Sequence, residues 1–373
     1  MSTNVRHDPF SFCDEFGPAK IVHIHTPSVG LRAIVVIDNV SAGPAIGGTR
    51  MAPDVSTMEC FRLARAMTLK NAACGLRHGG AKSVIFGDPK MPLREKEQLI
   101  RAFATAIRQL EDYIPGPDMG TDEIAMAWVH DEIGRSVGLP AEIGGIPLDE
   151  IGATGFGVAI AAEVAAPFAK ISLDGARVVV QGFGAVGQHA ARFLAKKGAR
   201  LVAASDTGGA ITDTAGLDIE ALVKLKEAGK SVVEHQHGEV MDGAALTALP
   251  CEIWIPAARP DVLRADNVDL LDCKLVVQGA NVPATAEAER RMFERGIVSV
   301  PDFIANAGGV ICAATEYAGG GEATAFAAIK EKIGRNTKIT LERAHVVGAP
   351  PIEAATTLAV ERLRAMMQLR RWR

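Results

Sequence analysis

The stretch from residue 177 to residue 206 limits the possible folds most. It opens with RVVVQ, a run of β-branched residues that predicts a buried strand, and continues into Gly182-Phe-Gly-Ala-Val-Gly187. A helix is expected from there to Ala195, and a second strand, ARLVAASD, ends at Asp206, nineteen residues after Gly187. A lone G-x-G-x-x-G is a weak signal. Here the strand, loop, helix and strand follow in the order of a βαβ unit that binds a dinucleotide.

This context predicts a nicotinamide dinucleotide as cofactor. The glycines let the backbone approach the pyrophosphate at the helix N-terminus, and the acid accepts hydrogen bonds from the ribose. The predicted cofactor-binding residues are Gly182, Phe183, Gly184, Ala185, Val186, Gly187, Asp206 and Thr207, with Ala257 and Ala258 after a later strand. Because no basic residue stands in 207–211, NAD is favoured over NADP, although Arg259 in the neighbouring loop leaves NADP open.

Composition excludes several classes of protein. A chain of 373 residues suggests about two domains, and 48% hydrophobic with 23% charged residues is ordinary for a soluble enzyme. A net charge of −4 gives no electrostatic case for nucleic acid or an anionic membrane, so we expect a small-molecule partner. Six scattered cysteines without a C-x-x-C, no membrane-length apolar run and no signal-peptide segment at the start indicate a cytoplasmic protein. No metal is expected, since His23 and His25 lack a nearby carboxylate pattern.

Residues 67–89, MTLKNAACGLRHGGAKSVIFGDP, contain two candidate functional lysines. The apolar spacing before them predicts a helix capped by Ser56, with Lys70 at the edge of its buried stripe. A tight turn is expected at Gly79-Gly80, and a buried strand after Lys82. Partial desolvation there would lower the pKa of Lys82 and make it usable as a base. The alternative is that each lysine is a solvated surface charge.

Four further segments carry candidate residues. Asp118 lies in a loop stiffened by prolines and glycines, where it could instead be a turn or cap residue. Thr154 opens a small-residue helix that it could simply cap, and Asn281 precedes Pro283, as a turn residue would. Ile46 projects from the glycine-rich segment GPAIGGTR.

Together these segments resemble the glutamate/leucine/phenylalanine/valine dehydrogenases. The lysines keep that family's spacing of twelve positions, PGPDMGT resembles its P-x-x-D-x-G-T loop, and PDFIANAGGV and QGANVPAT are similar to two further family segments. The resemblance runs from about residue 20 to 365. It implies an α/β fold of two domains with a cleft between them: a substrate domain of residues 1–148, which 335–373 rejoin, and a Rossmann-type domain of 149–334.

The resemblance also implies a reaction and roles. The reaction is the reversible NAD(P)-linked oxidative deamination of an L-amino acid to a 2-oxo acid and ammonia, in a homo-oligomer. Lys70 would pair with the α-carboxylate, Lys82 would activate the attacking water, and Asp118 would move the amine proton. Thr154 would lie near the nicotinamide carboxamide, and Asn281 would hold both substrate and cofactor.

The substrate side chain is where this sequence departs from the glutamate pattern. Glutamate-using members have a lysine at the position of Ile46 and a serine at that of Ala313, three residues after Val310. A γ-carboxylate buried there would lack a partner, so an apolar amino acid of the leucine, valine or phenylalanine class is expected. The predicted pocket also includes Gly47, and Gly116 is expected to leave room for a bulky group. Two alternatives remain: glutamate itself, given the glutamate-like features around Asp118 and Asn306, and a catalytically silent NAD(H)-binding sensor, which loss of a lysine or Asp118 would have favoured.

Overall fold

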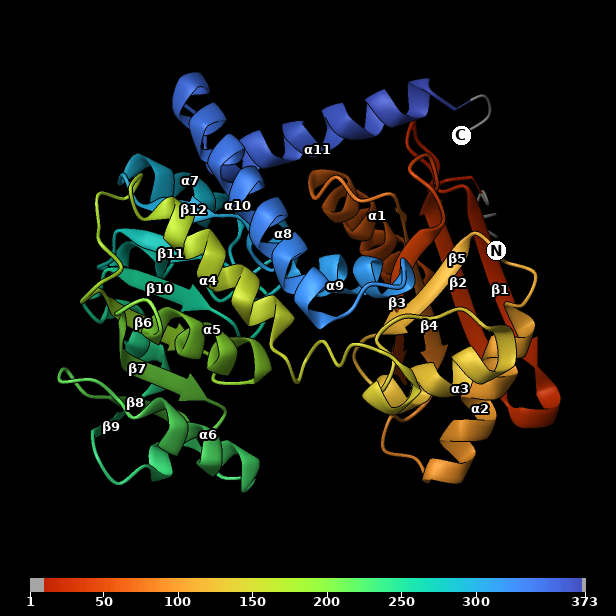
Figure 1. Ribbon diagram of the computed structural model, residues 1–373, viewed down its shortest axis with the longest axis horizontal. Helices are drawn as coiled ribbons and strands as arrows, with labels where there is room; N and C mark the ends of the chain where they lie inside the picture. The colour runs from red at the N-terminus through yellow and green to blue at the C-terminus, as the bar shows by residue number, and fades with distance from the viewer. Residues whose placement is uncertain (1–9, 371–373) are drawn as a thin grey trace, which may run out of the picture. The chain divides into compact units, whose positions relative to one another are not determined.

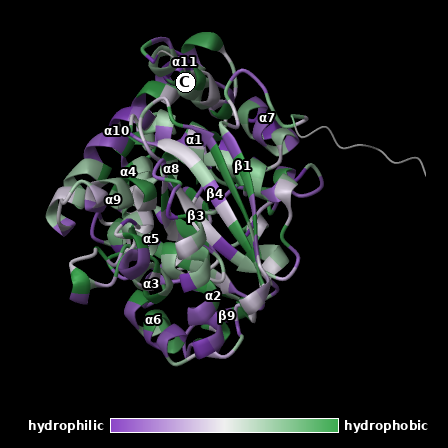
Figure 2. Cartoon of the chain, turned by 90° about the vertical axis from the view of Figure 1, so that its right-hand side faces the viewer, coloured by the Kyte–Doolittle hydropathy of each residue, from purple (hydrophilic) through white to green (hydrophobic). Residues whose placement is uncertain are grey.

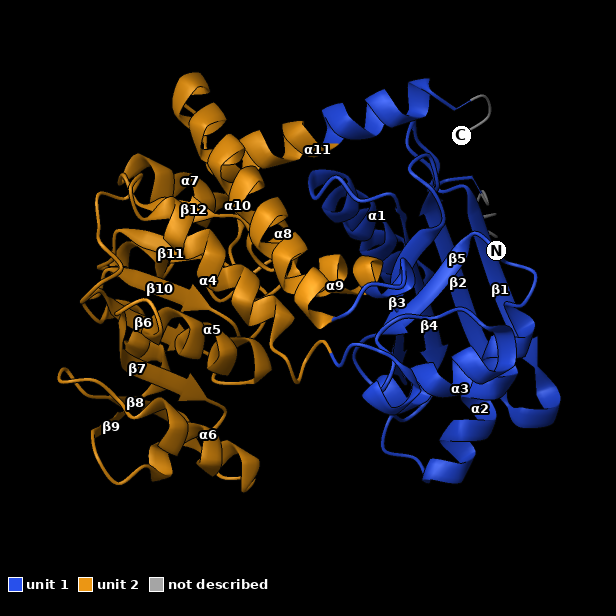
Figure 3. Ribbon diagram, viewed as in Figure 1, with its two compact units in different colours: residues 1–147, 316–321, 360–373 blue, residues 148–315, 322–359 orange. Residues whose placement is uncertain are grey.

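The computed structural model describes residues 10–370, which form two compact units, each with its own sheet (Figures 1 and 3). Unit 1 comprises Met1–Pro147, Glu316–Gly321 and Val360–Arg373, and unit 2 comprises Leu148–Thr315 and Glu322–Ala359. The C-terminal segment therefore returns to unit 1 at Val360, later than the expected residue 335. Residues 1–9, on which the expectation about export rests, lie outside the described residues.

Unit 1 is built on a five-stranded sheet in the order β1-β2-β4-β3-β5. Strands β1, β2 and β4 are antiparallel neighbours, whereas β3 runs parallel to both β4 and β5. The strands are β1 (Lys20–Thr26), β2 (Leu31–Asn39), β3 (Ala45–Ala52), β4 (Gly79–Phe86) and β5 (Tyr113–Pro117), and the helices are α1 (Thr57–Ala73), α2 (Leu93–Ala106) and α3 (Glu123–Ile133).

Apolar residues on both faces of this sheet explain why helices cover it on both sides. Along β2, Leu31, Ala33, Val35 and Ile37 pack with residues of α2 and α3, while Ile34 and Val36 pack with residues of α1. This alternation follows from the two-residue period of a strand. Both hydrophilic and hydrophobic colours run along α2 in Figure 2, in keeping with a helix that has one buried face.

Two local expectations in unit 1 are wrong. Gly79-Gly80 is not a tight turn but the start of β4, where a Cβ on Gly80 would lie 2.0 Å from the Thr68 amide nitrogen, so this glycine lets α1 approach the sheet. Tyr113–Pro117 is a strand rather than a loop, and its prolines are tolerated because β5 is an edge strand. The cap is confirmed: Ser56 Oγ accepts a hydrogen bond from the Glu59 amide at 3.1 Å.

Unit 2 is built on a seven-stranded sheet in the order β12-β11-β10-β6-β7-β8-β9. The five strands from β12 to β7 are parallel, and β8 and β9 continue the sheet antiparallel. The strands are β6 (Arg177–Gln181), β7 (Arg200–Asp206), β8 (Gly209–Thr212), β9 (Glu239–Met241), β10 (Ile253–Pro256), β11 (Leu275–Val277) and β12 (Val298–Val300).

Helices surround this second sheet, as its apolar strands require. They are α4 (Ala153–Ala165), α5 (Ala185–Ala195), α6 (Ile219–Glu227), α7 (Ala286–Glu294), α8 (Asp302–Ala305), α9 (Gly308–Tyr317), α10 (Glu322–Val347) and α11 (Pro351–Gln368), of which α9 and α11 extend into unit 1. Trp254, Val276 and Val179 pack with Ala288 and Met292 of α7 in one apolar cluster. The predicted order of strand, glycine loop, helix and strand is confirmed by β6, α5 and β7, and with it the two-part α/β fold. Within residues 10–370, no helix has the length and apolar character needed to cross a membrane.

Candidate active site

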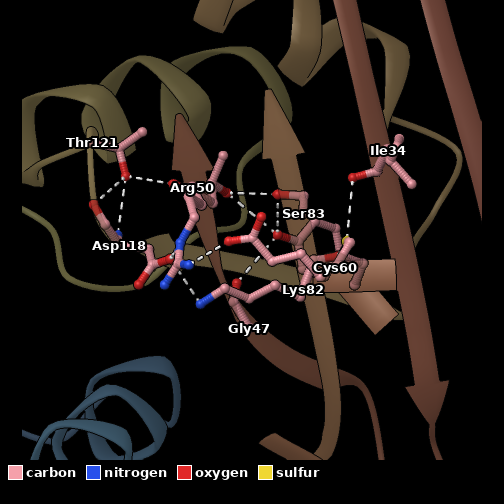
Figure 4. Close-up of polar contacts among 11 residues, drawn as sticks. Ile34, Gly47, Arg50, Cys60, Lys82, Ser83, Asp118 and Thr121 are labelled. Atoms are coloured by element: carbon pink, nitrogen blue, oxygen red, sulfur yellow. Dashed lines mark hydrogen bonds and ion pairs between the residues drawn. The ribbon is translucent and has the colours of Figure 1, made fainter. Parts of the chain in front are cut away.

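Two of the predicted catalytic residues, Lys82 and Asp118, form an ion pair in unit 1 (Figure 4). Lys82 lies on β4 and is 5% exposed, and Asp118 follows β5 directly. The Lys82 Nζ and Asp118 Oδ2 atoms are 2.9 Å apart. Lys82 is therefore buried rather than solvated. Asp118 does stand at a turn, since its carbonyl accepts from the Thr121 amide at 2.9 Å, but Asp122 rather than Asp118 caps α3 by accepting from the Ala125 amide.

Arg50 of β3, which was not predicted, also binds Asp118. Its Nε donates to Asp118 Oδ2 at 2.9 Å, and its Nη1 donates to Glu59 Oε1 at 2.6 Å. Burial alone would raise the pKa of Asp118, but the charges of Lys82 and Arg50 and their hydrogen bonds outweigh it, so this pKa lies below its ordinary value. Asp118 is therefore held as a carboxylate between two cations.

Gly48 makes the space in which this pair forms. A Cβ on Gly48 would lie 2.8 Å from Asp118 Cβ and 3.1 Å from Lys82 Nζ. The neighbouring Gly47, predicted to border the substrate, has no such space, since its Cβ would lie 1.8 Å from the Ala81 carbonyl oxygen. Only a glycine fits at either position, for two different reasons.

A buried hydroxyl network ties together the three strands that carry the pair (Figure 4). Tyr113 Oη lies 2.8 Å from Ser83 Oγ, and it donates to the Gly47 carbonyl at 3.2 Å. Thr121 Oγ1 donates to the Thr49 carbonyl at 2.7 Å and accepts from the Asp118 amide at 3.0 Å. Burial raises the pKa of Tyr113, so its hydroxyl stays protonated and available as a donor. The Asp118 loop is thus anchored to β3.

The predicted substrate residues of unit 1 lie on β3, α1 and β5. Ile46 is buried, two residues from Gly48 along β3, so alternation places both residues and Arg50 on one face of the strand. Lys70 lies in the last turn of α1 and is partly buried. Gly116 does not leave room as expected, because a Cβ there would meet Val137 Cγ2 at 3.1 Å. Val137 fills that space.

The glycine loop of unit 2 has the shape that a pyrophosphate requires. Gly182 has φ +98°, and a Cβ there would lie 2.6 Å from the Ala258 amide nitrogen, while a Cβ on Gly187 would lie 2.2 Å from the Gly182 carbonyl oxygen. A Cβ on Gly184, by contrast, would meet nothing within 4 Å. In the described chain no side chain caps the N-terminus of α5, which begins at Ala185. Open space in front of uncapped helix amides fits a dinucleotide pyrophosphate.

Asp206, the predicted ribose acceptor, is already occupied by protein groups. Its Oδ2 lies 2.6 Å from Lys226 Nζ of α6, and its Oδ1 accepts from Ser231 Oγ at 2.7 Å and from the Gly208 amide at 2.9 Å. Burial would raise the pKa of Asp206, but the hydrogen bonds from Lys226 and Ser231 lower it further than burial raises it. Lys226 lies outside residues 207–211, so the absence of a basic residue there does not leave Asp206 without a cation at the strand end.

Of the other predicted residues of unit 2, Ala257 and Ala258 directly follow β10, and the rest lie on α4, on α9 or in the loop after β11. Asn281 Oδ1 accepts from Asn306 Nδ2 at 3.0 Å, so Asn306 orients it. Thr154 does not cap α4, whose N-cap is Gly152. Val310 is partly buried and Ala313 is buried, both on α9. Within residues 10–370, no group of three or more His, Cys, Asp and Glu residues could hold a metal ion.

Two family models match the chain. Residues 18–135 match "Glu/Leu/Phe/Val dehydrogenase, dimerisation domain", and residues 144–371 match "Glutamate/Leucine/Phenylalanine/Valine dehydrogenase". The chain is 37% identical over 357 residues to a glutamate dehydrogenase of Aeropyrum pernix, covering 90% of this chain and 85% of that one. It is 40% identical over 297 residues to an NADP(+)-dependent glutamate dehydrogenase of Pyrobaculum calidifontis, covering 75% and 70%.

Solved structures agree in fold. The hetero-hexameric glutamate dehydrogenase of Thermus thermophilus in a leucine-bound form matches with a TM-score of 0.86 and 29% identity, covering 95% of this chain and 91% of that one. The L-tryptophan dehydrogenase of Nostoc punctiforme matches with a TM-score of 0.73 and 25% identity, covering 95% and 98%.

Proposed function

Because this chain belongs to the glutamate/leucine/phenylalanine/valine dehydrogenase family, we propose that it catalyses the reversible oxidative deamination of an L-amino acid to a 2-oxo acid and ammonia. The observation that carries the proposal is the buried contact of Lys82 Nζ with Asp118 Oδ2 at 2.9 Å. It joins a proton donor to a proton acceptor in the segments where the family has its catalytic residues.

In this proposal each residue has one task. Lys70 pairs with the substrate α-carboxylate. Lys82 holds and activates the attacking water, and Asp118, kept ionised by its two cations, takes the proton of the substrate amine. The nicotinamide ring, when bound against Thr154 and Asn281, supplies the hydride acceptor.

For the substrate side chain, the relatives and the residues support different candidates. The names of the sequence relatives support glutamate, and do so better than they support an apolar substrate. Ile46 and Ala313 support an apolar side chain, since neither can offer a charge or a hydrogen bond to a γ-carboxylate. An L-tryptophan dehydrogenase shares the fold. We favour an apolar L-amino acid, and we keep glutamate as the second candidate.

A panel of 2-oxo acids with ammonia tests the substrate. We expect the purified protein to reduce 2-oxoisocaproate or phenylpyruvate with a higher kcat/KM than 2-oxoglutarate. Ile46→Lys should then raise the ratio of kcat/KM for 2-oxoglutarate over 2-oxoisocaproate by about tenfold or more, with Ile46→Met as the control for lost branching. A wild-type protein that prefers 2-oxoglutarate makes glutamate the substrate.

For the cofactor, the contact between Lys226 and Asp206 supports use of both dinucleotides. The ammonium offsets the charge of the carboxylate that would otherwise repel a 2′-phosphate, and it lies where that phosphate would bind. The preference of an acid at this position for NAD thus applies only when the acid has no cationic partner. We also propose that the chain forms a homo-oligomer. The family model that matches residues 18–135 is described as a dimerisation domain, which supports this proposal. Light scattering after gel filtration measures the mass of the assembly.

A further inference from the structure

We propose that Arg50 is a positioning residue, whose guanidinium fixes the Asp118 carboxylate against Lys82 while Glu59 holds Arg50 in that orientation. This inference rests on the proposed function, because it assumes that Asp118 takes up the substrate amine proton. In this proposal Arg50 does not contact the substrate. It acts by holding the Asp118 carboxylate in place.

Both cations contact the same oxygen of Asp118. Lys82 Nζ and Arg50 Nε each lie 2.9 Å from Oδ2, and the side chains of Lys82, Arg50 and Asp118 are 7%, 18% and 20% exposed. Within residues 10–370, Oδ1 makes no hydrogen bond or ion pair. The clamp therefore fixes the orientation of the carboxylate and leaves its second oxygen for the amine.

Arginine suits this task because it donates in two fixed directions. The Nε atom faces Asp118, and Nη1 faces Glu59 Oε1 at 2.6 Å (Figure 4 shows Arg50 beside Lys82 and Asp118). A lysine has one nitrogen on a flexible stem and cannot bridge both carboxylates with that geometry. Glu59 stands in the first turn of α1, where the Ser56 cap fixes its backbone. The support for Arg50 is thus itself rigid.

The charges around Asp118 make the pH dependence of kcat a test of the proposal, because a purely structural role of Arg50 would not change it. The charged and titratable groups around the carboxylate are Lys82 from β4, Arg50 from β3, Glu59 and Cys60 from α1, and Tyr113 from β5. Burial raises the pKa of both Cys60 and Tyr113, so these two stay neutral. Among residues 10–370, loss of Arg50 leaves Lys82 as the one cation that contacts Asp118, and the pKa of Asp118 then rises toward its ordinary value or above it.

The experiment measures kcat and KM for amino acid oxidation across pH in Arg50→Lys, Arg50→Met and Glu59→Gln. Arg101→Lys is the control, because Arg101 binds Glu97, Asp131 and Glu132 at the surface of the same unit. We expect the Arg50 variants to lose about tenfold to a hundredfold in kcat with a smaller change in KM. In Arg50→Met, which removes the positive charge, the acid limb of the kcat profile should move to higher pH, because Asp118 is protonated earlier as pH falls. Glu59→Gln should lower kcat less, and the control should match wild type.

The outcomes separate the two claims. If Asp118→Asn keeps wild-type turnover, the proposed function fails. If Asp118→Asn loses turnover while folded Arg50→Lys and Arg50→Met keep the wild-type kcat and Arg50→Met keeps the wild-type acid limb, the positioning role alone is overturned. Should Arg50→Met fail to fold, Arg50→Lys and Glu59→Gln decide: an unchanged kcat in both also overturns the positioning role.

Discussion

At the scale of single residues, the candidate site depends on a missing side chain as much as on the charged ones. Gly48 lies between Ile46 and Arg50 on one face of β3, and its lack of a Cβ leaves the space that Asp118 and Lys82 occupy. A glycine inside a strand usually lowers stability. At position 48 it is nevertheless required, because any larger residue would prevent the ion pair.

Gly48→Ala is therefore expected to disable the site with little effect on the fold. The added methyl group would lie 2.8 Å from Asp118 Cβ, so the carboxylate must move away from Lys82. We expect a loss of about 100-fold in kcat. Gly321→Ala, in the same unit and with nothing within 4 Å of its added Cβ, is the matched control. Wild-type kcat in a folded Gly48→Ala would contradict the need for this space.

Residue patterns predicted the local parts of the site and missed the distant ones. Ser56 as a cap and the Gly182–Gly187 loop could be predicted, because neighbouring residues determine them. The family motifs indicated Lys82 and Asp118 as candidates but did not predict the contact between them. Arg50 contacts Asp118 across 68 positions of sequence, and Val137 fills the space beside Gly116. Such contacts depend on which strands become neighbours, and no local spacing encodes that.

At the scale of elements, a lysine of α6 changes the cofactor preference that is expected from Asp206 at the end of β7. Lys226 extends from α6 to Asp206 at 2.6 Å, and we expect Lys226→Met to lower kcat/KM for NADP by about tenfold or more while NAD is affected less. Lys224→Met, an exposed position on the same helix, is the control. An equal loss with both cofactors would show that Lys226 serves Asp206 and not a 2′-phosphate.

The packing of α7 against β11 and β12 buries an acid that should make stability depend on pH. Burial raises the pKa of Glu289 to about 7, its Oε1 accepts from Gln278 Nε2, and its Oε2 has no partner among the described residues. A raised pKa means that the folded state binds more protons than the unfolded state between the two pKa values. The contribution of Glu289 to the free energy of unfolding is therefore fully present below the pKa that this residue has in the unfolded chain. It is lost as the pH rises toward and past 7.

Glu289→Gln should remove this dependence. We expect the wild-type free energy of unfolding to fall by about 2.5 kcal/mol more than that of the variant between pH 5 and pH 8, from the linkage of one shifted group. Urea unfolding of both proteins at the two pH values measures the difference, and groups common to both cancel. Identical pH dependence in the two proteins would show that Glu289 ionises in the folded state as it does in the unfolded chain.

At the scale of the whole molecule, the two units divide the proposed work. Unit 1 contains Lys70, Lys82 and Asp118, while unit 2 contains the glycine loop, Asp206 and Asn281. The α/β class of both units followed from the sequence, because alternating strands and helices with a glycine fingerprint allow few other architectures. The return of the chain to unit 1 at Val360 did not follow, since the apolar pattern of α10 and α11 does not say which sheet they cover.

The central claim is that Lys82 and Asp118 of unit 1 carry out the proton transfers of amino acid oxidation, and that the dinucleotide site is built separately from residues of unit 2. The most direct test measures NADH binding by fluorescence and ammonia-dependent NADH oxidation with the preferred 2-oxo acid in wild type, Lys82→Ala and Asp118→Asn. Both variants should bind NADH with nearly the wild-type Kd and lose at least about 100-fold in kcat. Near-wild-type turnover in either variant, or no ammonia-dependent oxidation by the wild-type protein with any 2-oxo acid, would contradict the account.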